Sequence, residues 1–199
     1  MKKFHFIKLI TILCLVLSFS FISINTNVSA ATTQKVSQDL IKTSSSALVS
    51  LGIMQGDEKG NLKLNDYITR CEFVALVNRM MGFENNTNVE SVKVPFTDIK
   101  KTHWAYNTIK IALKRELING YTDNTVRPNA TVNFAEANAI LIRALGYNKT
   151  LSGSWPDNVL NKAKELSISK GVELDKYKKL TRGEAAVLIY NSLTVNIKK

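Results

Sequence analysis

The stretch TRCEFVALVNRMM, residues 69–81, recurs in altered form twice further along the chain. Residues 133–145 read NFAEANAILIRAL, and residues 181–193 read TRGEAAVLIYNSL. Each stretch opens with Thr or Asn and carries Glu three residues later, which is the capping-box pattern of a helix N-terminus. Apolar residues then repeat at helical spacing. Each stretch is therefore predicted to be an amphipathic helix with one face in the core.

The segments before these three helices also repeat. Sixteen residues separate Trp104 from Gly120 and Trp155 from Gly171, and the first copy has Leu40 at the Trp position. The apolar positions of the second copy predict a helix that ends near Gly120, because glycine commonly terminates helices. The chain thus divides into helix–loop–helix units.

Two helices alone cannot bury such faces, so the three second helices are expected to pack against one another in an all-α fold. The first unit, with a degenerate start, spans 31–84, and a linker follows over 85–95. The second unit spans 96–150. The third, whose loop is shorter by three residues, spans 151–199 with the tail.

Residues 1–30 have the features of a secretory signal peptide. Lys2 and Lys3 precede an apolar stretch, and small residues lead up to a cleavage point before Ala31. An uncleaved membrane anchor is the alternative, although the apolar stretch is short for a span. We expect a mature chain that starts at Ala31 and has no membrane span.

The net charge of the expected mature chain indicates which kinds of partner it can bind. The whole chain carries 27 basic and 16 acidic residues, and removal of three signal lysines leaves 24 against 16, a net charge of +8. Because an exported protein meets little nucleic acid, anionic wall polymers or acidic lipid surfaces are the expected partners. Cys71 is the one cysteine left, which excludes a disulfide framework and predicts a buried helix residue. No metal or cofactor is expected.

Arg70 and Arg182 each follow a helix cap directly. A cation is unfavourable there, because the helix dipole makes that end partly positive. The guanidinium together with free helix N–H groups can instead bind a carboxylate or phosphate. The alternative is that each Arg only pairs with Glu72 or Glu184, or with a neighbouring acidic residue of a loop.

Aromatic and acidic residues supply further candidates. Trp104 and Trp155 can stack on sugar rings, and the alternative is ordinary packing in the first turn of a helix. Asp98 can accept hydrogen bonds from sugar hydroxyls, although capping of the following helix is the simpler interpretation.

These residues resemble the S-layer homology (SLH) motif of bacterial surface proteins, three copies of which would cover most of 35–193. The second unit carries most of the resemblance, and the first and third contribute a Thr-Arg-x-Glu element. The motif residues are Phe96-Thr97-Asp98, Trp104-Ala105, Gly120-Tyr121-Thr122-Asp123, Arg127-Pro128-Asn129, Glu136, Thr69-Arg70-Cys71-Glu72 and Thr181-Arg182-Gly183-Glu184.

The resemblance implies a pseudo-threefold assembly around a central three-helix bundle. It also implies non-catalytic anchoring at the cell wall, through grooves that bind an acidic, often pyruvylated, secondary cell-wall polysaccharide. Phe134 replaces the Arg in unit two and Leu40 replaces the Trp in unit one, so at least one groove is expected to bind poorly. The implied ligand-binding residues are Arg70, Arg182, Trp104, Trp155, Thr69, Thr181 and Asp98.

Three other functions compete with wall anchoring. An enzyme is disfavoured, because His103 is the one histidine of the mature chain and no catalytic motif is visible. A calcium-dependent protein-interaction module is also disfavoured, because Asp57, Asp66 and Asp123 do not have the spacing of a twelve-residue calcium loop. A structural surface-layer or adaptor protein, which binds mainly other protein copies, is the remaining alternative.

Overall fold

The computed structural model describes residues 35–85 and 88–198. Every regular element in these ranges is helical, as the repeat pattern predicts. The predicted signal peptide lies outside the described residues. The helices are α2 (Gln38–Ser50), α3 (Arg70–Met80), α4 (Tyr106–Lys114), α5 (Phe134–Ala144), the 3₁₀ helix η1 (Asn148–Thr150), α6 (Asp157–Glu165) and α7 (Arg182–Ser192).

The second helix of each unit begins at a capping box, as predicted. The Thr69 hydroxyl accepts the Glu72 N–H at 3.4 Å, and the Glu72 carboxylate accepts the Thr69 N–H at 2.8 Å. Asn133 and Thr181 make both bonds in the same way at the starts of α5 and α7. These bonds satisfy donors that a helix N-terminus leaves open, and they fix where α3, α5 and α7 begin.

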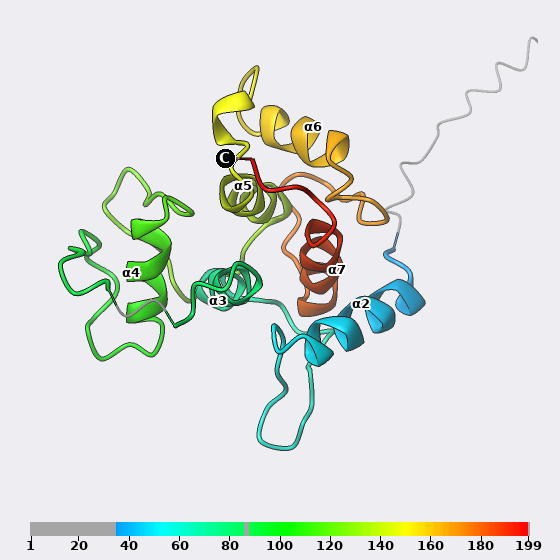
Figure 1. The fold of residues 1–199 in the computed structure, drawn as a ribbon, viewed down its shortest axis with the longest axis horizontal. Coiled ribbons are helices and arrows are strands. Elements are labelled where there is room, and N and C mark those ends of the chain that lie inside the picture. The colour runs from blue at the N-terminus through cyan, green and yellow to red at the C-terminus, as the bar shows by residue number, and fades with distance from the viewer. Residues whose placement is uncertain (1–34, 86–87, 199) are drawn as a thin grey trace, which may run out of the picture. The chain divides into compact units, whose positions relative to one another are not determined.

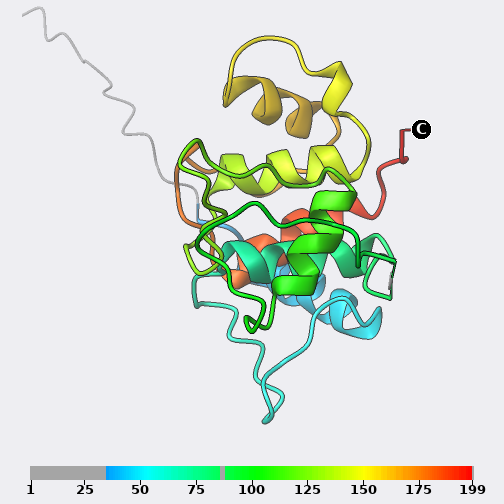
Figure 2. The same ribbon diagram turned by 90° about the vertical axis from the view of Figure 1, so that its left-hand side faces the viewer.

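The three second helices form the centre of the described region. α3, α5 and α7 pack pairwise against one another, with α4 on α3, α6 on α5 and α2 on α7 (Figure 1). In the turned view the three central helices run alongside one another (Figure 2). The first helix of each unit thus lies on the second helix of another unit. In the last case, α2 of the first unit covers α7 of the third unit. The threefold relation between the units stays a prediction.

A closed circuit of backbone hydrogen bonds joins the residues just before the three central helices. The Ile68 N–H donates to the Leu180 carbonyl at 3.1 Å, and the Leu180 N–H donates to the Val132 carbonyl at 3.0 Å. The Val132 N–H closes the circuit on the Ile68 carbonyl at 3.1 Å. All three residues are fully buried, so these bonds are shielded from water. They hold the starts of α3, α5 and α7 together.

The core follows the predicted helical faces. Phe73, Leu76 and Val77 on α3 are buried, as are the matching apolar residues of α5 and α7. Cys71 is a buried free thiol in the first turn of α3, as predicted, and burial raises its pKa. The linker lies against α4, since Lys110 and Lys114 donate to carbonyls in it.

The expected helix end near Gly120 is wrong. α4 ends at Lys114, and Glu116 takes the left-handed conformation that follows a helix, with φ of 55°. Gly120 lies further on, in the loop, and its φ is not positive. A Cβ there would lie 2.1 Å from Cε1 of Phe96, so glycine is required by close packing rather than by helix termination.

Candidate ligand-binding grooves

Arg70 turns away from its own capping box and toward the second unit. Its Nη2 donates to the Asn119 carbonyl at 3.2 Å, and its guanidinium lies 5.3 Å from the centre of the Tyr121 ring. Arg70 is only 6% exposed, yet its Nε has no hydrogen-bond partner. In the described part of the chain it forms no ion pair, so the alternative of a pair with Glu72 is wrong.

The Arg70 side chain lines a cavity of about 330 Å³, which we call groove 1. All three units contribute to it: Arg70 comes from the first, Tyr121 and Arg143 from the second, and Trp155 and Tyr177 from the third. Its remaining lining residues are Asn119, Gly120, Asn133, Glu136 and Ala139.

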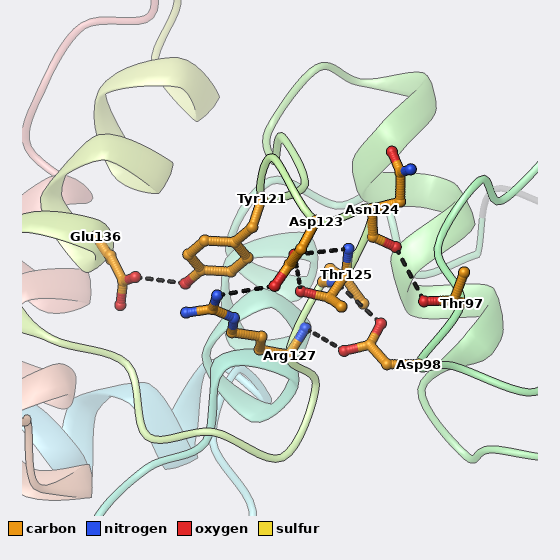
Figure 3. A network of polar contacts seen from close by, with 9 residues as sticks. Thr97, Asp98, Tyr121, Asp123, Asn124, Thr125, Arg127 and Glu136 are labelled. Atoms are coloured by element: carbon orange, nitrogen blue, oxygen red, sulfur yellow. Dashed lines mark hydrogen bonds and ion pairs between the residues drawn. The ribbon is translucent and has the colours of Figure 1, made fainter.

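Tyr121 lines groove 1, and polar contacts with side chains of its own unit hold it in place (Figure 3). Its hydroxyl donates to the Glu136 carboxylate at 2.5 Å, and the Arg127 guanidinium covers its ring at 3.9 Å. Asp123 holds Arg127 with an ion pair of 3.0 Å. Burial, followed by the bond to Glu136, raises the pKa of Tyr121, so the hydroxyl stays protonated and keeps this bond.

Asp98 does not cap the following helix, and that interpretation is wrong. Its two carboxylate oxygens accept the N–H groups of Val126 and Arg127 at 2.9 and 2.7 Å (Figure 3). The Thr97 N–H donates to the Asn124 carbonyl at 3.0 Å, which adds a second brace. Asp98 therefore holds the loop that carries Arg127, and its function in ligand binding stays a prediction.

Arg182 occupies the same register as Arg70 but is more fully bonded. Its Nε donates to the Leu62 carbonyl and its Nη2 to the Gln55 carbonyl, both at 3.0 Å. It lines a second cavity of about 390 Å³, groove 2, with Asp57, Asp66 and other residues of the first unit. The other residues in the lining are Gly56, Asn61, Leu62, Lys63, Tyr67, Glu72 and Gln55.

Grooves 1 and 2 differ in the balance of charge. Two cations, Arg70 and Arg143, face groove 1 against the single carboxylate of Glu136. In groove 2 the cations Lys63 and Arg182 face three carboxylates, those of Asp57, Asp66 and Glu72. Burial lowers the pKa of Arg143, and the nearby charge of Arg70 adds a smaller effect in the same direction. The lining of groove 1 therefore has an excess of positive charge, and the lining of groove 2 has an excess of negative charge.

The position of Phe134 in unit two corresponds to that of the two arginines. Its side chain is 5% exposed and belongs to the hydrophobic core. The cavity between the third unit and the start of the first, about 260 Å³, is lined by Lys35, Ser37, Leu40, Gly171 and Glu173. Phe134 does not line this cavity, and its packing in the core leaves the start of α5 without the arginine that begins α3 and α7.

The free helix N–H groups that the sequence suggested for anion binding are already used. The Arg70 N–H donates to the Ala130 carbonyl at 2.8 Å, and the Arg182 N–H donates to the Asp66 carbonyl at 2.8 Å. The hydroxyls of Thr69 and Thr181 are engaged in the capping boxes. The prediction that these N–H groups bind an anion is therefore wrong. The hypothesis of an anion site now depends on the guanidinium groups alone.

The two tryptophans are exposed, which does not fit ordinary packing. Trp155 is 50% exposed and lies in groove 1 with Arg70. Trp104 is 61% exposed and lies in a separate cavity of about 180 Å³, beside Arg79. Arg79 is bound there by Glu84 at 2.9 Å. Groove 1 brings an exposed indole, that of Trp155, and a buried, partly unpaired guanidinium, that of Arg70, into one cavity.

Sequence reasoning missed Arg143, Tyr121, Arg127 and Tyr177 as residues of the site. A signal for Arg143 was present, since Arg79 and Arg143 both stand ten residues after a helix cap. Their equivalent in the third unit, Asn191, donates to the Ile168 carbonyl much as Arg143 donates to that of Leu117. In the second and third units, the residue at this position thus bonds to a loop carbonyl. In the second unit that residue, Arg143, also lines groove 1.

Within 35–85 and 88–198, no cluster of three or more His, Cys, Asp or Glu residues is placed to hold a metal ion. None of the helices in the same ranges has the length and apolar character that crossing a bilayer requires.

Comparison with known proteins agrees with the repeat. The family model of the S-layer homology domain matches residues 46–74 and 95–137. A middle cell wall protein of Brevibacillus brevis is 33% identical over 84% of this chain, which covers 16% of that relative. A surface layer protein of Brevibacillus choshinensis is 33% identical over 63% of this chain and 11% of its own length.

A cellulosome-anchoring protein of Acetivibrio thermocellus is 24% identical over 70% of this chain and 35% of its own length. The chain therefore spans roughly a tenth to a third of the length of these relatives. The matched residues include the Thr69 cap with Arg70 and the whole loop that carries Tyr121 and Arg127. On the repeat, the fold and these matches, the chain belongs to the S-layer homology domain family.

Proposed function

We propose that this chain is a non-catalytic anchor at the bacterial cell surface, which binds an acidic wall polysaccharide in groove 1. Relatives named for the cell wall, the surface layer and cellulosome anchoring support the location and the anchoring function. The acidic group is a carboxylate such as that of a pyruvylated sugar.

The observation that carries the proposal is the environment of Arg70. A buried guanidinium whose Nε has no partner has lost its water without gaining a full set of acceptors, which is costly unless a ligand supplies one. Arg143 lines the same cavity and adds a second positive charge. An anionic group in groove 1 would complete the hydrogen bonds of Arg70 and lower the repulsion between the two arginines.

The aromatic residues of groove 1 suit a sugar ring beside that anion. Trp155 and Tyr177 are both about half exposed and both line the cavity. Indole and phenol faces stack on the apolar faces of sugars, while their N–H and O–H groups stay available as donors. Together these groups favour a glycan with a negative substituent over a simple inorganic anion.

The test compares wall polysaccharide before and after chemical removal of its acidic substituent. The unmodified chain should bind the acidic form at least about tenfold more tightly, because charge-assisted hydrogen bonds contribute about 1.5–3 kcal/mol. Arg70→Gln should remove this preference, whereas Arg182→Gln, in the acidic groove 2, should keep it. Equal binding of the two polysaccharides by the unmodified chain, or self-association without polysaccharide binding, would contradict the proposal.

A further inference from the structure

A second positively charged cavity lies at the opposite end of α5 from its capping box. Its volume is about 400 Å³, and it is formed where α4 and α5 end and where the last described residues return to them. We call it the tail cavity. It is lined by Arg115, Glu116, Arg143, Gly146, Asn148, Lys149, Thr150 and Lys198.

The C-terminal segment is held in place to form this cavity. The Lys198 N–H donates to the Leu145 carbonyl at 2.8 Å, and the Tyr147 hydroxyl donates to the Asn196 carbonyl at 3.0 Å. Gly146 allows the segment to approach, since a Cβ there would lie 2.0 Å from the Lys198 carbonyl oxygen. Lys198 is therefore held at the cavity by one backbone hydrogen bond, one side-chain hydrogen bond and the close approach that Gly146 allows.

The charge of the tail cavity is not balanced within the described residues. The lining holds four cationic residues, Arg115, Arg143, Lys149 and Lys198, and one carboxylate residue, Glu116. None of these five residues takes part in an ion pair in the described ranges. Two helix C-termini add about half a negative charge each, which still leaves a clear excess of positive charge.

Arg143 connects this cavity with groove 1, because its side chain lines both. Its Nη1 donates to the Leu117 carbonyl at 3.4 Å, which fixes the guanidinium between the two cavities. Positive charge therefore continues from Arg70 through Arg143 to Lys149 and Lys198. A polymer that carries an anionic group in each repeat unit can place one group in each cavity.

We propose that the tail cavity is a second anion subsite, which binds a further acidic unit of the polymer whose first unit occupies groove 1. The inference rests on the proposed function and adds a distinct prediction, namely that affinity grows with polymer length. Two linked contacts on one ligand strengthen binding well beyond either alone, because the second forms at a high effective concentration.

The experiment uses polysaccharide released from cell walls of the producing bacterium and sized into single-repeat and long fractions. The test variant is Lys149→Gln with Lys198→Gln. Its matched control is Lys42→Gln with Lys59→Gln, which removes two exposed lysines from the first unit. The test variant should bind the long fraction roughly three- to tenfold more weakly than the control, since exposed charge contacts are individually small. Binding of the single repeat should not change.

The outcomes separate the inference from the proposed function. Failure of the unmodified chain to bind either fraction contradicts both. Normal binding with no difference between test and control variants on the long fraction overturns the tail cavity alone, as does an equal loss on both fractions. Loss of binding to phosphatidylglycerol vesicles, with polymer binding intact, would instead assign these lysines to a lipid surface and also overturn the inference.

Discussion

At the scale of single residues, Arg70 and Arg182 show how one register supports two different environments. Both follow a Thr cap, and the sequence predicts the same use for both. Arg182 makes two bonds to carbonyls of the first unit, whereas Arg70 makes one and leaves its Nε unpaired. These acceptors lie 127, 120 and 49 residues away along the chain, so local spacing could not reveal them.

The different bonding predicts different effects on stability. Arg182→Gln removes both bonds that tie α7 to the loop of the first unit, and it should lower the free energy of unfolding by about 1–3 kcal/mol. Arg70→Gln should lower it by about 1 kcal/mol or less, because a poorly bonded buried cation is removed. Urea unfolding of the two variants beside the unmodified chain measures both values. A larger loss for Arg70→Gln would show that Arg70 is mainly structural.

At the scale of elements, the first helices end in the same way although their sequences do not show it. Gly52, Glu116 and Ser167 stand at equivalent positions, four residues before Gly56, Gly120 and Gly171. All three have a left-handed φ, of 71°, 55° and 60°. The sequence predicted the end of the second unit's first helix near Gly120 instead, because only the first unit places glycine at the true helix end.

This position offers a test of backbone strain with no change of charge. Ser167→Gly should raise the free energy of unfolding by about 0.5–1 kcal/mol, because glycine tolerates the left-handed region that a Cβ disfavours. Gly52→Ser is the reverse exchange and should lower it by about 1 kcal/mol, since a Cβ there meets no atom within 4 Å and only the φ is unfavourable. Denaturant unfolding compares the two. Changes of the same sign would rule out strain as the cause.

At the scale of the whole described region, the three units are interlocked rather than strung together. Each central helix donates its first N–H to a loop of another unit: Arg70 to Ala130, Phe134 to Lys178 and Arg182 to Asp66. Each first helix also covers a central helix of another unit. The capping boxes, helical faces and central packing could be predicted, because they depend on local periodicity. The hydrogen bonds from the central helices to loop carbonyls of other units could not be predicted, since they depend on the path of the chain between units.

Interlocking predicts that the units do not fold separately. A chain of residues 31–150, which lacks the third unit, loses the Leu180 link of the backbone circuit and leaves the faces that α7 covers on α2, α3 and α5 exposed. It should show little cooperative unfolding and weak helical circular dichroism. Deletion of 196–199 is the control, which removes the tail yet leaves the circuit intact. A cooperative transition in the 31–150 chain would mean that two units suffice.

The same arrangement makes the three grooves unequal, which sets the number of sites on the molecule. Groove 1 has an excess of positive charge and groove 2 has an excess of carboxylates, while α5 begins with Phe134, packed in the core, where α3 and α7 begin with an arginine. Calorimetry of a chain of residues 31–199 with a single acidic repeat should therefore give about one binding site per chain.

Raising the salt concentration should weaken that site, because its ligand is bound by charge and mobile ions screen the attraction. Arg70→Gln should abolish the site, while Arg182→Gln should leave the number of sites unchanged. Loss of the Tyr121 hydroxyl in Tyr121→Phe frees the Glu136 carboxylate beside Arg70 and should weaken binding without removing the site. Three equivalent sites, or a site indifferent to Arg70, would mean that the sugar ring rather than the acidic group determines where the polymer binds.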